Sequence, residues 1–200
     1  LDKPKVSHAA ITTSNSKVSG ARFAEVRKAV WPRLTDTSKL DMIKAMALYG
    51  DQFITPLLAM TKSGAELYRI AALKSLRVCA TSEQISDLVN ISGSASVKVA
   101  RDEVLIEIAN RSKNTSALNI YEWLLSNGET SMVKQAAWTG TIVANPLGSQ
   151  KIIVRYIVSD DDAMVIAAIQ ASRFVSGDSF TQKLAQQVAA VSPERARVLV

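Results

Sequence analysis

The sequence predicts an all-α protein built from repeated pairs of helices. Apolar residues recur at i, i+3 and i+4 from Ala21 to about residue 190, which is the spacing of amphipathic helices. The sequence also contains an internal repeat. Four short segments recur every 29 to 36 residues, and each begins with a large apolar or aromatic residue and ends in alanine. We find no convincing alternating pattern of the kind that marks a half-buried strand.

The composition is that of a globular chain. The 200 residues are 48% hydrophobic and 21% charged, which is too apolar for intrinsic disorder. A chain of this length buries enough surface to fold without disulfides. No run approaches the roughly 18 consecutive apolar residues that a spanning helix needs, so we expect no membrane span.

The basic charge is concentrated near the N-terminus. Residues 1–50 hold nine lysines and arginines against four acids, a net +5, whereas the remaining 150 residues contribute +1. Residues 1–20 are rich in Ser, Thr and Lys, which predicts a flexible basic arm or linker before a helical domain at 21–200. Because the chain begins at Leu1, we expect a processed protein or a fragment. The cytoplasm is the default location, and export with a removed signal stays open.

Each expected unit is a helix, a short polar turn and a second helix. The turn signals are Ser63-Gly64, Ser92-Gly93, Asn127-Gly128 and Ser159-Asp160-Asp161. Glycine at such a position supplies the left-handed residue that ends the first helix. The expected units are 21–49, 51–80, 81–112, 115–146, 147–177 and an incomplete unit at 178–200.

An alanine near the start of each second helix is expected on the inner face, where a small side chain lets paired helices approach. These alanines are Ala71, Ala100, Ala136 and Ala168. The clearest versions of the segment are VKVA at 97–100 and VKQAA at 133–137.

With the turns, these segments make residues 51–177 resemble HEAT repeats. The resemblance implies a right-handed α-solenoid of HEAT-like helix–turn–helix repeats, about five to six units long, whose second helices line a concave surface. It also implies a scaffold that holds partner proteins. The sequence departs from the family's Asp–Arg ladder, because only the turn at 159–162 is acidic and the basic position ends in Ile166. An armadillo-like or other α-solenoid is the alternative.

The residues for catalysis or metal binding are sparse. A single cysteine, Cys79, and a single histidine, His8, exclude an internal disulfide and a Cys/His metal site within one chain. No glycine-rich phosphate loop is present. We therefore expect no cofactor, no metal and no enzymatic activity. The enzymatic alternative would need a cleft lined by Glu103, Glu107 or Asp162.

The predicted function is a non-catalytic protein-binding scaffold that uses the concave face and an open, apolar C-terminal end. The alternative is a nucleic-acid-binding module that uses the basic N-terminal section. Core packing is the alternative for the tryptophans and tyrosines, but Tyr121 and Trp123 are the better candidates for exposure, because residues two apart on a helix cannot easily both face one core. The candidate partner-binding residues are aromatic, basic or at the C-terminus: Arg27, Lys28, Trp31, Arg33, Lys74, Tyr121, Trp123 and Leu199.

Overall fold

The computed structural model describes residues 26, 28–112, 115–145, 148–175 and 177–189. These residues form helices and no strand, which confirms the all-α prediction for this part of the chain. The chain divides into two compact units, Leu1–Cys79 and Ala80–Val200. The predicted arm at 1–20 lies outside the described residues.

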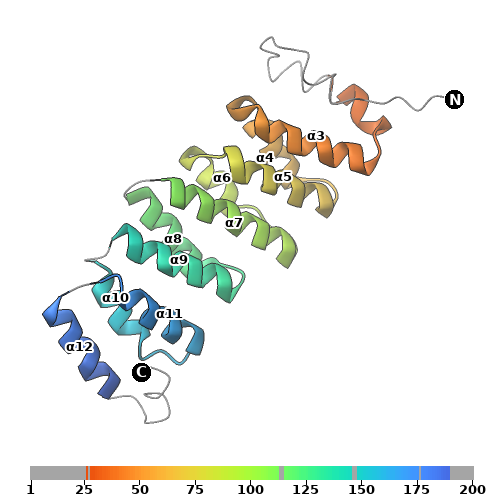
Figure 1. The fold of residues 1–200 in the computed structure, drawn as a ribbon. Helices are drawn as coiled ribbons and strands as arrows, with labels where there is room; N and C mark the ends of the chain where they lie inside the picture. The colour runs from red at the N-terminus through yellow and green to blue at the C-terminus, as the bar shows by residue number, and fades with distance from the viewer. Residues whose placement is uncertain (1–25, 27, 113–114, 146–147, 176, 190–200) are drawn as a thin grey trace. The chain divides into compact units, whose positions relative to one another are not determined.

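The first unit is built around helix α5 (Glu66–Cys79), which packs against both α3 (Asp36–Leu48) and α4 (Ile54–Lys62) (Figure 1). The 3-10 turn η1 (Trp31–Arg33) precedes α3, and the 3-10 turn η2 (Gly50–Phe53) lies between α3 and α4. The Thr35 hydroxyl caps α3 by accepting the Ser38 N–H. The core of the unit is apolar and includes Ile43, Met46, Leu57, Leu73 and Leu76.

The second unit is a succession of helices that contact their neighbours in the chain. Its helix α7 packs against α8 and α9, α9 packs against α11, and α10 packs against α11 and α12. Its elements are η3 (Ser82–Gln84), α6 (Ile85–Val89), α7 (Ala95–Arg111), α8 (Thr115–Asn127), α9 (Ser131–Ala144), α10 (Ser149–Tyr156), α11 (Asp162–Ser172) and α12 (Asp178–Ala189).

The predicted turns fall between the observed helices of the pairs α4–α5, α6–α7, α8–α9 and α10–α11. Gly64 has a positive φ of 101° and directly follows Ser63, the C-cap of α4, as expected. Gly93 also has a positive φ, 153°, but α6 already ends at Val89 with Asn90 as its C-cap, so Gly93 lies in the turn and does not end that helix. Gly128 does not adopt positive φ, and that prediction is wrong. A Cβ at Gly128 would instead lie 2.5 Å from the Leu124 carbonyl oxygen, so the close approach of the backbone requires glycine here.

In α9, the alanine that faces the core lies one residue after the predicted one. Ala100 and Ala168 are buried as predicted and Ala71 is half-buried, but Ala136 is exposed. The fully buried alanine of α9 is Ala137. One residue along a helix is a rotation of about 100°. Since both positions hold alanine, the sequence did not show which one faces the core.

A buried ion pair joins two successive helix pairs of the second unit. Arg101 donates to Asp102 from Nε at 2.9 Å and lies 2.7 Å from it through Nη2, and Asp102 is fully buried. Arg101 Nη1 also donates to the Ile91 carbonyl at 3.1 Å, while Asp102 Oδ2 accepts the Glu129 N–H at 2.8 Å. The pair thereby connects the turn before α7 with the turn before α9.

Candidate functional site

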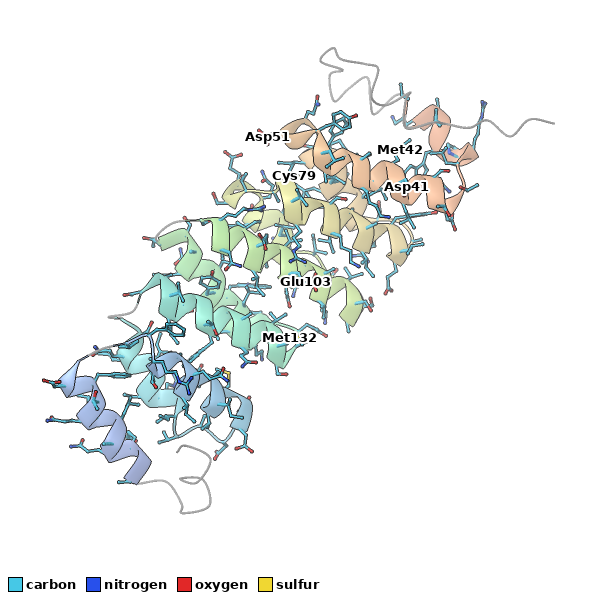
Figure 2. All side chains as sticks on the ribbon, in the orientation of Figure 1. Asp41, Met42, Asp51, Cys79, Glu103 and Met132 are labelled. Carbon is cyan, nitrogen blue, oxygen red and sulfur yellow. The ribbon has the colours of Figure 1, made fainter. Side chains whose placement is uncertain are left out.

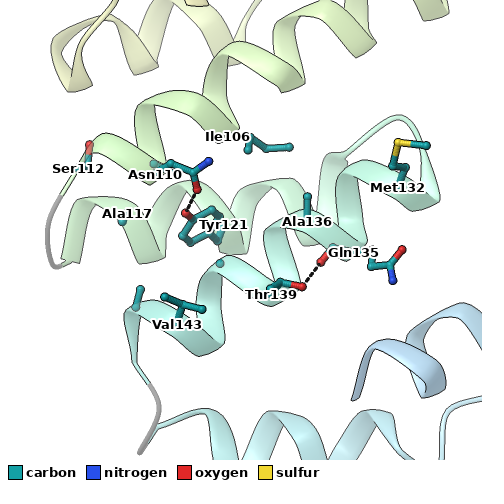
Figure 3. Close-up of a pocket in the computed structure, with 13 residues that line it drawn as sticks. Ile106, Asn110, Ser112, Ala117, Tyr121, Met132, Gln135, Ala136, Thr139 and Val143 are labelled. Atoms are coloured by element: carbon teal, nitrogen blue, oxygen red, sulfur yellow. Dashed lines mark hydrogen bonds between the residues drawn. The ribbon is translucent and has the colours of Figure 1, made fainter. Parts of the chain in front are cut away.

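The candidate site is a groove of about 600 Å³ between α7 and α9 of the second unit (Figure 3). One wall is the face of α9 that carries Met132, Ala136, Thr139 and Val143. Met132 and Val143 are large apolar residues that are 77% and 64% exposed. Figure 2 labels Met132 on α9. The opposite wall comes from α7 and includes Ile106, Ala109 and Asn110.

The floor of the groove is the ring of Tyr121, which comes from α8 behind the two walls. A Cβ on Gly140 would lie 2.3 Å from Tyr121 Cζ, so the missing side chain of Gly140 lets the ring lie directly against α9. The Tyr121 hydroxyl donates to Asn110 Oδ1 on α7 at 2.7 Å. One tyrosine thus links three helices and sets the depth of the groove.

The C-termini of two helices lie at one end of the groove. Helices α7 and α9 both end there, near Ser112 and Val143 (Figure 3). The C-terminus of a helix carries about half a negative charge. The last turn of α9 contains no basic residue, whereas the last turn of α7 contains Arg111. Burial raises the pKa of the Tyr121 phenol, and the negative charge of Glu107 raises this pKa further. The floor of the groove is therefore a neutral phenol at neutral pH.

Tyr121 and Trp123 differ in their burial and in their neighbours. The expected exposure of Tyr121 is wrong, because only 3% of this residue is exposed. Trp123 is half-buried beside α7, with the Arg101 guanidinium 5.0 Å from the centre of its ring. Both residues are covered because α8 packs against α7 and α9 together, so more than one of its faces is inside. Trp138 is fully buried and packs edge-on against Tyr156.

The basic candidates lie in the first unit, so the structure does not bring them into the groove. Lys28, Arg33 and Lys74 are exposed, and Trp31 is half-buried. Arg27 and Leu199 lie outside the described residues.

Two other lysines of the basic section lie close to acidic partners. Lys39 Nζ lies 3.7 Å from Asp36 and 5.8 Å and 5.5 Å from the ring centres of Trp31 and Tyr68. Lys44 Nζ lies 3.7 Å from Asp41. The section from Lys28 to Lys44 is therefore a mixed surface of both signs.

Of the groove residues, Tyr121 was a predicted candidate. The others were missed because their pattern resembles a core face. Met132, Ala136, Thr139 and Val143 have the i, i+4, i+7 and i+11 spacing of an amphipathic helix. The available signal was Gly140, a glycine in the middle of a helix, which often marks close packing.

Within the described residues, no group of three or more His, Cys, Asp or Glu side chains is placed to hold a metal ion. The described helices include none that is both long enough and apolar enough to cross a membrane. In comparisons with family models, curated proteins and solved structures, none matches the chain.

Proposed function

We propose that this chain is a non-catalytic protein-binding module whose helix pairs build a HEAT-like, right-handed α-solenoid. Two features support the repeat architecture. The helix pairs recur along the sequence, and those of the second unit contact mainly their chain neighbours. The observation that carries the function is the groove between α7 and α9, which presents exposed apolar side chains on a preformed surface.

The groove has the chemistry of a protein-binding surface. Met132 and Val143 are exposed large hydrophobics beside the small residues Ala136 and Gly140. Contiguous exposed apolar surface rimmed by polar groups is typical of interaction sites, and methionine is enriched at interfaces. Thr139, Gln135 and Asn110 supply hydrogen-bonding groups along the same groove.

Peptide display tests this function with a matched pair of variants. Thr139→Tyr fills the middle of the groove from an exposed position, and Gln182→Tyr adds the same side chain to an exposed position of α12. We expect wild type to enrich peptide binders that also bind Gln182→Tyr and fail to bind Thr139→Tyr. Circular dichroism and thermal melting check that both variants are folded.

Two results would contradict the proposal. The first is that no peptide is enriched. The second is that the enriched peptides bind wild type and Thr139→Tyr equally, because they would then recognise a surface other than the groove.

A further inference from the structure

We infer that a pocket between α10 and α12 binds a small molecule that carries a phosphate monoester beside an apolar group. The pocket lies in the second unit and has a volume of about 460 Å³. The residues that line it are Gly148, Gln150, Lys151, Val154, Phe180 and Lys183. None of them lines the groove between α7 and α9, so this inference is independent of the proposed function.

The packing of α10 against α12 brings two lysines to one pocket (Figure 1). Lys151 is on α10 and Lys183 is on α12, 32 positions later. Between them lie the half-buried Val154 and the buried Phe180, which belongs to the hydrophobic core of the second unit. A Cβ on Gly177 would lie 3.9 Å from Gln150 Nε2, so the start of α12 lies beside the Gln150 carboxamide.

The two lysines carry charge that no described residue neutralises. Among the described residues, neither Lys151 nor Lys183 has a hydrogen-bond or ion-pair partner. Lys39, Lys44 and Lys98, in contrast, each lie within 3.7 Å of a carboxylate oxygen. The ammonium groups at the pocket are therefore available to a ligand.

No acid balances this charge from the two helices. Helix α10 contains no acidic residue, and α12 contains only Asp178. At about 100° per residue, Asp178 is rotated by about 200° from Phe180 and by about 140° from Lys183. Asp178 therefore projects from a different side of α12, and the described lining of the pocket has a net charge of +2.

This lining matches a phosphate monoester better than a carboxylate. A phosphate monoester carries a charge of about −1.5 to −2 at neutral pH and presents several acceptor oxygens, whereas a carboxylate carries a single negative charge. Lysine binds phosphate as a point charge with several N–H donors, and the Gln150 carboxamide adds a further donor. Val154 and Phe180 offer an apolar surface to the rest of the ligand, and the volume lies within the roughly 300–1,000 Å³ of small-molecule sites.

Phenyl phosphate is the probe that tests the inference on the full ¹⁵N-labelled chain. It is titrated at about pH 7.5 and about 20 mM salt, where exposed charges are weakly screened, and binding is followed by the backbone amide signals of Gly148 and Gln150. Benzoate keeps the ring with one negative charge, and inorganic phosphate lacks the ring. Lys151→Gln and Lys183→Gln each remove one charge from the pocket. Lys74→Gln removes the same charge from an exposed position of α5 and is the matched control.

We expect phenyl phosphate to shift both signals saturably and to bind more tightly than benzoate or inorganic phosphate. Each pocket variant should weaken binding roughly two- to fivefold, the range for an exposed ion pair, whereas Lys74→Gln should bind like wild type. Binding should also weaken at about pH 5.5, where the phosphate is largely a monoanion. Circular dichroism and thermal melting check that the variants are folded.

Four results would overturn the inference in whole or in part. The site is wrong if phenyl phosphate causes no saturable shift, or if Lys74→Gln weakens binding as much as the pocket variants. The dianion is wrong if benzoate binds as tightly as phenyl phosphate, and the apolar contact is wrong if inorganic phosphate does. A phosphotyrosine peptide that binds more tightly than phenyl phosphate would assign the phosphate to a protein and overturn the small molecule.

Discussion

The ring of Tyr121 occupies the space in which a side chain on Gly140 would begin. Three ring atoms lie between 2.3 and 2.8 Å from the position of a Gly140 Cβ, which is far inside van der Waals contact. The two residues are 19 positions apart in the sequence, on helices α8 and α9. Their contact sets the depth of the groove and places the Tyr121 hydroxyl on Asn110.

Gly140→Ala is therefore expected to destabilise the protein. In an exposed helix this change stabilises by about 1 kcal/mol, but here overpacking against the ring is expected to cost a net ~1–3 kcal/mol. Urea unfolding followed by circular dichroism measures the change. In a Tyr121→Ala background the same substitution should become neutral or favourable. A more stable Gly140→Ala single variant would show that the ring moves freely.

The protein is expected to lose stability above about pH 10, in part through Tyr121. Its pKa is raised in the folded state, so below the unfolded pKa both states hold the proton and stability is unaffected. At higher pH the unfolded state loses the proton first, and stability falls as pH rises through the folded pKa. Tyr121→Phe should make this decline shallower, as measured by urea unfolding at several pH values. Tyr68, whose pKa is raised mainly by its hydrogen bond to Asp36, remains in the variant. If the free energy of unfolding falls with pH equally steeply in wild type and Tyr121→Phe, the role of Tyr121 is contradicted.

Asp102→Ala is expected to be among the most destabilising substitutions of a buried residue in the second unit. It leaves the Arg101 guanidinium buried without its carboxylate and removes the acceptor of the Glu129 N–H. Breaking a buried pair in this way costs about 3–5 kcal/mol. The control is Glu129→Ala, which breaks only the more exposed Lys98–Glu129 pair and is expected to cost about 0–1 kcal/mol. Equal losses of unfolding free energy in the two variants would refute this assignment.

Leucine substitutions at two adjacent alanines test the face of α9. Ala137→Leu forces extra volume into a fully buried site and should destabilise by about 1–3 kcal/mol. Ala136→Leu adds the same side chain at an exposed position and should leave the free energy of unfolding nearly unchanged, although it narrows the groove. The reverse order in thermal or urea unfolding would place Ala136 inside.

Oligonucleotide binding tests the nucleic-acid alternative. We expect no micromolar binding of single- or double-stranded oligonucleotides by fluorescence anisotropy at about 50 mM salt, because Lys39 and Lys44 lie beside Asp36 and Asp41. Binding that disappears at about 200 mM salt and is lost in a Lys28→Glu, Arg33→Glu variant would instead favour that function.

The sequence by itself determined the helices and the turns between them. Apolar periodicity and the glycine at 64 are local signals, and a helix is built from bonds between residues four apart. These signals were sufficient to place the turns of four helix pairs.

The tertiary structure decided which side of each helix faces the core and which side faces solvent. Whether Ala136 or Ala137 is buried depends on the rotation of α9 against its neighbours, and two adjacent alanines carry no information about it. The burial of Tyr121 and the groove above it likewise depend on α8 lying against both α7 and α9. Such contacts join residues far apart in the sequence, so they are set by packing between helices, which local sequence patterns do not encode.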